Sequence, residues 1–312
     1  MKKTLMAAAC AVAMTSTMAA APALAKPLTI GVSMALFDDN FLTAVRQGMS
    51  QHGQSIPGLR MQFQDAQGDV GKQLSEVQNF ISQGVDAIIV NPVDTSTTKR
   101  ITQAAVAAHI PLVYVNRRPD EASLPPSVAV VASDDKLAGR LEMTSLAEKM
   151  HGQGNLVIML GDLANNSTQG RTAGVKEVLA KYPGIKVVEE QTANWERTKA
   201  IDLMNNWITK GDKITGVAAN NDEMALGAII ALHSNGMDPK TMAIGGSDAT
   251  PDALDALGKG TLTVTVFQNA KGQGISAVDD AIKLANGQPV TQFDTIAYEL
   301  VTPQNYKSFL SR

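Results

Sequence analysis

The sequence predicts an α/β fold made of two similar domains, each built around a parallel sheet. Short apolar runs alternate with amphipathic segments from Lys26 onward, and such alternation is typical of βαβ units. The same pattern restarts after a proline-rich crossing, Leu124-Pro125-Pro126. With 312 residues, 44% of them hydrophobic, the chain is long enough for two domains with real cores.

The first round of the pattern predicts five strands and three helices. The strands are expected at residues 28–34, 59–63, 87–90, 112–115 and 128–131. The helices are expected between them, at residues 40–55, 70–83 and 96–108. Each strand is short and apolar, as expected for strands covered on both faces.

The second round repeats this order. Strands are expected at residues 156–160, 185–189, 214–219, 242–244 and 262–266, with a last strand near 295–300. Helices are expected at residues 135–150, 169–181, 196–208, 224–233, 251–258 and 270–285. The restart therefore predicts two domains of similar size.

The clearest strand-to-helix junction is the stretch Asn220-Asn221-Asp222. It follows the apolar run 214–219 and precedes an apolar helix that stops at Asn235-Gly236. Asp222 is well suited to cap this helix, because its carboxylate can accept hydrogen bonds from the free N–H groups of the first turn. Asn220 and Asn221 would then lie at the carboxyl end of a strand, where ligands bind in open α/β sheets.

The N-terminus has the features of a cleaved secretory signal over residues 1–25. Lys2-Lys3 form a basic segment, residues 5–18 are apolar, and Ala23-Leu24-Ala25 matches a cleavage site. The only cysteine, Cys10, lies inside this segment. We therefore expect a secreted mature chain that contains no disulfide.

Charge and hydropathy argue against two classes of partner. Without the two lysines of the leader, the 27 basic residues fall to 25 against 30 acidic ones, a formal charge of −5. There is no basic cluster, so nucleic acid is not an expected partner. After the leader no run of 18 apolar residues follows, so we expect no membrane-spanning segment.

Four ordered motifs resemble the periplasmic sugar-binding proteins of ABC importers, specifically the ribose-binding type with the type I fold. They are Ile89-Val90-Asn91-Pro92, Ile110-Pro111-Leu112-Val113, the stretch from Asn220 to Gly227, and Asp248-Ala249-Thr250-Pro251-Asp252. The resemblance covers essentially residues 26–310. The same fold occurs in LacI-type repressors, but here a secretion signal stands where their DNA-binding helices would be.

The resemblance implies two Rossmann-like lobes joined by three hinge crossings, with the ligand in the cleft between them. The crossings are expected near Ala132, Gln268 and Tyr298. The N-terminal lobe would then contain residues 26–132 and 269–297, and the C-terminal lobe residues 133–268 and 298–312.

In the first lobe, the residues expected at the ligand follow three strands. After the first strand, Phe37 and Phe41 could cover the apolar faces of a sugar ring while Asp39 accepts from its hydroxyls. For Phe41, packing on a helix face is the alternative, and Asp38 is preferred as a helix cap. Later strand ends supply a further set, namely Asn91, Asn116 and Arg117. Arg117 offers a fork of donors suited to vicinal hydroxyls, and Arg118 is expected to face solvent.

In the second lobe, the expected ligand contacts are Gln169, Trp195, Asn221, Asp248 and Gln268. The family often has Arg-x-Arg-x-x-Gly where this chain has Gln169-Gly170-Arg171-Thr172-Ala173-Gly174. Gln169 replaces the arginine that contacts sugar, and Arg171 matches the second, usually structural, arginine. By the same resemblance Trp195 would stack on the sugar, with a role in the core as the alternative. Gln268 lies on a crossing, which would couple ligand contact to closure.

The sequence offers no convincing catalytic, metal or cofactor site. Gly245-Gly246-Ser247-Asp248-Ala249 nearly matches a nucleophile elbow, but its last glycine is replaced and the last histidine, His233, lies upstream. Residues 68–73 fail the phosphate-loop pattern at two positions. The four histidines are scattered singly, so no metal site is expected.

We therefore predict a non-catalytic receptor that captures a small polyol and presents it to an ABC permease. Residues 37–43 and 115–119 are similar to the inositol- and rhizopine-binding branch, which favours myo-inositol, with ribose or galactose as the alternative. A chemoreceptor is a further possible partner. A carbohydrate-active enzyme that uses Asp39 and Asp248 is the alternative from another class.

Overall fold

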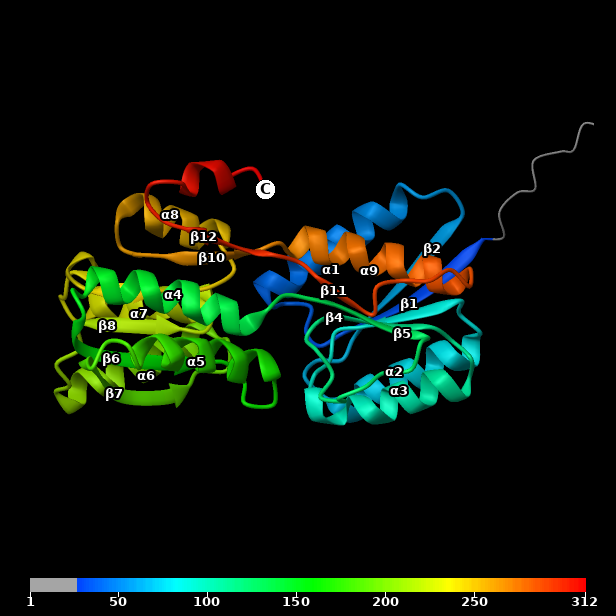
Figure 1. Cartoon of the computed structure of the whole chain (residues 1–312), viewed down its shortest axis with the longest axis horizontal. Coiled ribbons are helices and arrows are strands. Elements are labelled where there is room, and N and C mark those ends of the chain that lie inside the picture. The colour runs from blue at the N-terminus through cyan, green and yellow to red at the C-terminus, as the bar shows by residue number, and fades with distance from the viewer. Residues whose placement is uncertain (1–26) are drawn as a thin grey trace, which may run out of the picture.

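The computed structural model describes residues 27–312. The predicted signal segment, including Cys10, lies outside the described residues. The chain forms two lobes that lie end to end, with three chain segments passing between them (Figure 1). Within residues 27–312 no helix is both long and apolar enough to cross a bilayer.

The first lobe contains a six-stranded parallel sheet in the order β11-β5-β4-β3-β1-β2. Its strands are β1 (Leu28–Met34), β2 (Leu59–Asp65), β3 (Ala87–Val90), β4 (Leu112–Asn116), β5 (Val128–Ala132) and β11 (Phe293–Thr295). Helices α1 (Asn40–Gln54) and α9 (Ala270–Ala285) cover one face. The other face is covered by α2 (Val70–Gln83), η1 (Thr95–Thr97) and α3 (Thr98–Ala107).

The second lobe contains a four-stranded parallel sheet in the order β7-β6-β8-β9, and an antiparallel pair β10-β12. Its strands are β6 (Gln153–Leu160), β7 (Gly184–Thr192), β8 (Gly216–Ala219), β9 (Ala243–Gly245), β10 (Thr265–Gln268) and β12 (Tyr298–Val301). On one face of the sheet lie α4 (Asp135–Lys149) and α5 (Asn166–Leu179). On the other lie α6 (Arg197–Lys210), α7 (Asp222–Ser234), η2 (Pro239–Thr241), α8 (Pro251–Lys259) and η3 (Tyr306–Phe309).

The predicted strand near 295–300 is in fact two strands in different lobes. β11 pairs with β5 in the first sheet, and β12 pairs with β10 in the second lobe. The chain crosses between the lobes over the two residues that separate Thr295 from Tyr298. The other two crossings connect β5 to α4 and β10 to α9 (Figure 1). All three crossings therefore lie at strand ends, next to the cleft.

Two glycines allow α4 and α5 to pack unusually closely. A Cβ atom on Gly139 would lie 1.9 Å from the carbonyl oxygen of Arg171, and one on Gly174 would lie 2.2 Å from that of Lys136. Because both obstacles are backbone atoms, neither glycine can be replaced without separating the helices. The close contact fixes the position from which Arg171 extends toward the cleft.

Candidate ligand-binding site

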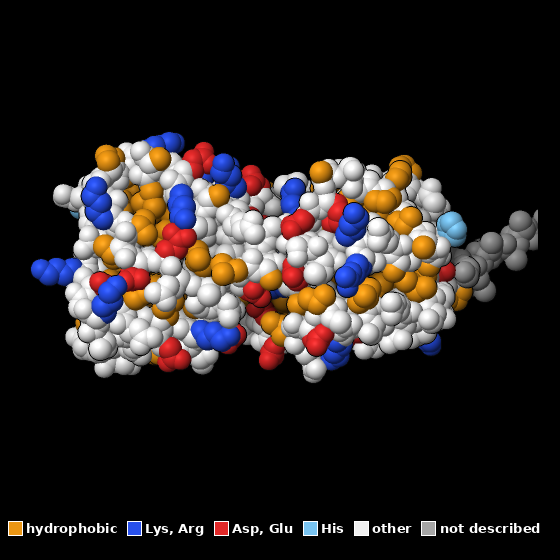
Figure 2. All heavy atoms as spheres, turned by 90° about the horizontal axis from the view of Figure 1, so that it is seen from below, with side chains coloured by type: hydrophobic (Ala, Val, Ile, Leu, Met, Phe, Trp, Pro, Cys, Tyr) orange, Lys and Arg blue, Asp and Glu red, His pale blue; other side chains and the backbone are white. Residues whose placement is uncertain are grey.

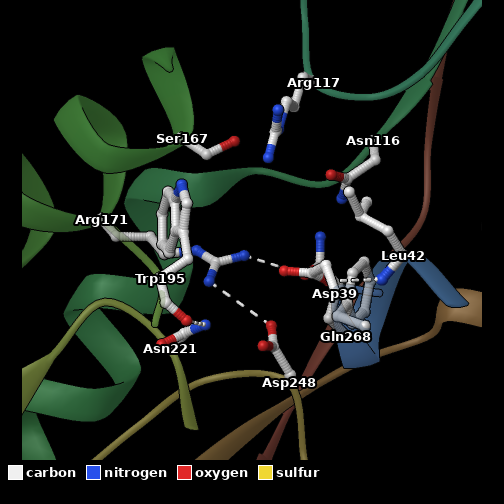
Figure 3. A pocket seen from close by; sticks show the side chains of 11 residues that line it. Asp39, Leu42, Asn116, Arg117, Ser167, Arg171, Trp195, Asn221, Asp248 and Gln268 are labelled. Carbon is white, nitrogen blue, oxygen red and sulfur yellow. Dashed lines mark hydrogen bonds and ion pairs between the residues drawn. The ribbon is translucent and has the colours of Figure 1, made fainter. Parts of the chain in front are cut away.

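A small cavity lies between the lobes, where the carboxyl ends of strands from both sheets face each other. This is the place at which ligands bind in open α/β folds. Figure 3 shows the side chains that line it, which come from both lobes: Asp39, Phe41, Leu42, Asn116, Arg117, Ser167, Arg171, Trp195, Asn221, Asp248 and Gln268.

Asp39 has two roles at the start of α1. Its Oδ1 accepts the N–H of Leu42 at 2.7 Å, so Asp39, not Asp38 as predicted, caps the helix. This bond uses only one carboxylate oxygen, and the side chain also lines the cavity. Burial raises the pKa of Asp39, although the Leu42 N–H and the charge of Arg117 act in the opposite direction.

The guanidinium of Arg117 is buried at the cavity and has few hydrogen-bonding or charged partners within the protein. Its Nη1 donates to the carbonyl oxygen of Pro92 at 2.8 Å. No carboxylate among residues 27–312 lies within the 4.0 Å limit of an ion pair with it. Burial therefore lowers the pKa of Arg117, while the more distant charges of Asp39 and Asp162 oppose this shift. In Figure 3 the guanidinium points into the cavity, so a ligand can supply the missing acceptors.

Arg171 is the centre of a buried polar network on the opposite wall. Its Nη1 donates to the carbonyl oxygen of Asn220 at 2.6 Å, and its Nη2 donates to Gln268 Oε1 at 2.9 Å and to the Tyr298 hydroxyl at 3.0 Å. Ion pairs join it to Asp135 at 3.3 Å and to Asp248 at 3.5 Å. Although burial acts to lower the pKa of Arg171, the surrounding Tyr298, Asp248 and Asp135 raise it.

The network of Arg171 ties together segments that are far apart in the sequence. Gln268 ends β10 and Tyr298 begins β12, so both lie at crossings between the lobes. Asp248 follows β9, and burial raises its pKa well above the usual value even though Arg171 opposes the shift. The sequence predicted a structural role for Arg171, and the structure adds that the side chain forms part of the cavity wall.

Asn221 caps α7 and also lines the cavity. Its Oδ1 accepts the N–H of Met224 at 3.0 Å, and its Nδ2 donates to the carbonyl oxygen of Trp195 at 3.2 Å. The prediction that Asp222 caps this helix is therefore wrong. Asp222 is fully buried and joins two other segments, accepting from Thr265 Oγ1 at 2.6 Å and from the Thr250 N–H at 2.8 Å.

Burial raises the pKa of Asp222 to about 6, and its hydrogen bonds oppose the shift. The native state therefore holds this proton more tightly than the unfolded chain, whose pKa is 3.8. The resulting stabilisation is complete below pH 3.8 and is lost as the pH rises through 6. Between pH 4 and pH 7, we expect the free energy of unfolding of wild type to fall by about 2–3 kcal/mol more than that of Asp222→Asn, as measured by urea unfolding. Parallel pH profiles of the two proteins would contradict this assignment.

The indole of Trp195 forms one side of the cavity (Figure 3). A Cβ atom on Gly161 would lie 2.2 Å from its Cζ2, so only glycine leaves space for the ring. The guanidinium of Arg171 lies 5.6 Å from the ring centroid. The indole Nε1 is buried and has no hydrogen-bond partner among the described residues, so it can donate to a ligand.

Three residues that line the cavity have backbone conformations that are unfavourable for residues other than glycine. The φ angles are 69° for Asn116, 69° for Trp195 and 126° for Asp248. Such conformations cost about 1–3 kcal/mol each and concentrate at functional sites. Here they direct three polar or aromatic side chains into the same cavity.

The structure brings eight of the eleven predicted contacts to the cavity and leaves three outside it. Phe37 packs under the guanidinium of Arg46, 4.1 Å from the ring centroid. Asn91 is fully buried and joins strand ends, accepting the N–H of Ala35 at 3.3 Å and donating to Val115 O at 3.1 Å. Gln169 is exposed on α5 and does not line the cavity.

Three residues that line the cavity were absent from the predicted set: Leu42, Ser167 and Arg171. Ser167 and Arg171 are four positions apart in α5 and therefore lie on one face of it. Gln169, two positions from each, faces the other way. A helix start at Asn166 would have revealed this from spacing alone. Among residues 27–312 no cluster of acidic, histidine or cysteine side chains could hold a metal ion.

The sequence profile of the periplasmic binding protein domain matches residues 30–289. The chain belongs to this family. Of the curated family members, a Rhizobium meliloti protein provisionally named as rhizopine-binding is 47% identical over 284 residues, covering 90% of this chain and 92% of its own.

Solved structures of other periplasmic binding proteins match the whole architecture. A Bacillus halodurans solute-binding protein with bound myo-inositol has a TM-score of 0.87 and 41% identity, covering 92% of this chain and 98% of its own. A Caulobacter myo-inositol-binding protein, bound to myo-inositol, has a TM-score of 0.84 and 26% identity, with the same coverage. The predicted α/β fold and family are thus confirmed, and the protein is a solute-binding protein whose relatives take sugars and cyclitols.

Proposed function

We propose that this protein captures a cyclitol, in the first instance myo-inositol, between its lobes and delivers it to the permease of an ABC importer. The observation that carries the proposal is the cavity between the lobes, which combines buried donors and acceptors with aromatic side chains from both sides. The Bacillus halodurans relative with bound myo-inositol supports this ligand class.

The chemistry of the cavity suits a ring that carries hydroxyls on every carbon. Asp39 and Asp248 can accept from hydroxyls, and these charge-assisted bonds are about twice as strong as neutral ones. Arg117 and the indole Nε1 of Trp195 can donate. Asn116, Asn221 and Gln268 extend the polar set, and the rings of Phe41 and Trp195 can cover the C–H faces. The ligand would favour the closed form by as much as it binds that form better than the open one.

The same cavity favours binding over catalysis. Asp39 caps a helix and Asp248 is ion-paired with Arg171, so both carboxylates already have positioning roles. No histidine or cysteine lines the described cavity. We therefore propose a receptor without enzymatic activity, which is directed to the periplasm by a signal segment, residues 1–25, that is then cleaved off. A chemoreceptor is a second candidate partner for the liganded form.

A thermal-shift screen of mature residues 26–312 tests the proposal. A ligand that binds only the folded state stabilises it by about 2.7 kcal/mol at a hundred times its Kd. We expect myo-inositol to raise the melting temperature more than equal concentrations of D-ribose or D-galactose. A rise with ribose or galactose alone would replace the cyclitol by a monosaccharide. No rise with any of these solutes would overturn the polyol class.

A further inference from the structure

Two asparagine side chains join the lobes outside the cavity. The Nδ2 of Asn40 donates to Oε1 of Glu223 in the second lobe at 2.9 Å. The Nδ2 of Asn166 donates to the carbonyl oxygen of Arg118 in the first lobe at 2.7 Å and reaches Oδ1 of Asp120 at 3.4 Å. Neither asparagine lines the cavity, so neither has a place in the ligand contacts described above.

The two asparagines occupy equivalent places in the two lobes. Asn40 is the first residue of α1, which follows β1, and Asn166 is the first residue of α5, which follows β6. Each lobe therefore extends one amide from the helix after its first parallel strand toward the other lobe. A backbone bond, from the N–H of Thr95 to the carbonyl oxygen of Ala164 at 3.1 Å, joins the lobes on the Asn166 side.

The acceptor for Asn40 is held in place before the lobes meet. Arg197 donates from Nε to Oε2 of Glu223 at 2.8 Å and from Nη2 to Oε1 at 2.9 Å, and it also pairs with Asp252 at 2.7 Å. All of these groups belong to the second lobe, so the carboxylate does not depend on closure for its orientation. Only the Asn40 side chain must be ordered when the bond between the lobes forms, which keeps the entropic cost low.

We propose that Asn40 and Asn166 are closure latches, positioning residues that set the affinity for solute without touching it. Their bonds join opposite lobes, so separating the lobes would break them, and forming them increases the fraction of closed protein. A ligand that binds the closed form gains apparent affinity in proportion to that fraction. The gain is the same for every ligand, because the latches contact none of them.

The test uses mature chains carrying Asn40→Ala, Asn166→Ala or both, with myo-inositol and D-ribose as probes. Each single variant should raise Kd about three- to tenfold, chiefly through faster dissociation. The factor should be equal for both probes, and the melting temperature without ligand should fall only slightly. Asn40→Asp should weaken binding more than Asn40→Ala, because it places a carboxylate against Glu223. Asn286→Ala is the matched control, since its side chain bonds only to Ile282 O in its own lobe.

Unchanged Kd values, or factors that differ between the two probes, would overturn the latches. The inference depends on the proposed function only for the choice of probes. If wild type binds neither probe, the proposed function fails. Small-angle X-ray scattering then tests separately whether Asn40 and Asn166 hold the lobes together. The double variant must then have a larger radius of gyration than wild type, and equal radii would overturn the proposal.

Discussion

Arg171→Met should destabilise the fold by about 3–5 kcal/mol and abolish solute binding, the largest effect expected of any single substitution at the site. The guanidinium is 5% exposed and paired with Asp135 and Asp248. Methionine keeps much of the volume but leaves the buried carboxylate of Asp248 without a positive partner. It also releases Gln268 and Tyr298, which lie at two crossings between the lobes. Urea unfolding and calorimetry measure the two effects.

Arg140→Met provides the matched control for this substitution. Arg140 lies on the neighbouring helix α4, is one-third exposed, and pairs with Asp134 and Glu177 at 3.7 and 3.5 Å. Ion pairs of this exposed kind contribute about 0–1 kcal/mol, so this variant should unfold almost as wild type does. If Arg171→Met lost no more stability than Arg140→Met, the buried network would not have the role assigned to it.

Arg117→Ala should weaken binding of the solute at least tenfold, which corresponds to about 1.4 kcal/mol or more. The reason differs from that for Arg171. The buried Arg117 has one internal hydrogen bond, to Pro92 O, and burial lowers its pKa, so its charge is costly without a ligand. The unliganded variant should therefore be as stable as wild type or more stable, while its complex is weaker.

Arg118→Ala separates this effect from general loss of positive charge at the cleft. Arg118 is adjacent and partly exposed, and its backbone carbonyl, which accepts from Asn166, survives the substitution. The guanidinium carbon of Arg118 lies 6.0 Å from the ring centroid of Phe293, and the side chain does not line the cavity. The affinity of the Arg118→Ala variant for myo-inositol should remain within a factor of about two of that of wild type. Equal losses in both arginine variants would contradict a specific contact by Arg117.

The strand ends were the most predictable part of the site. A parallel sheet brings the carboxyl ends of its strands to one edge, so residues that follow an apolar run, such as Asn116 and Asn221, could be assigned to the cleft from sequence alone. The same rule does not say which way a side chain turns. Asn91 follows β3 in the same manner, yet its amide points inward and joins β1 to β4.

The helix caps show a limit of local reasoning. In both Asp38-Asp39 and Asn221-Asp222, two neighbouring residues can each accept a hydrogen bond from a helix N–H group. In both cases the predicted cap is one residue away from the cap in the structure. What decides is the tertiary environment. Asp222 accepts hydrogen bonds from Thr250 and Thr265, which belong to other elements. The local sequence around Asp222 does not predict these contacts.

The buried network around Arg171 could not have been predicted from the sequence, because the partners of this arginine are widely separated along the chain. Asp135, Asn220 and Tyr298 meet at one guanidinium only after both sheets and two crossings are in place. Gln169 failed to reach the cavity for a simpler reason. Motif alignment assigned it to the ligand, but α5 begins at Asn166, which turns Ser167 and Arg171 inward and Gln169 outward.

The central claim, that the cavity between the lobes holds the polyol, is tested most directly by the fluorescence of Trp195 during titration with myo-inositol. Trp195 lines the cavity, whereas Trp207, the other tryptophan, is buried in the core of the second lobe. We expect a saturable change with one ligand per chain. In Trp195→Phe, thermal shift should still report binding while the fluorescence change is lost. An equal fluorescence change in Trp195→Phe, or none in wild type, would show that the ligand does not occupy this cavity.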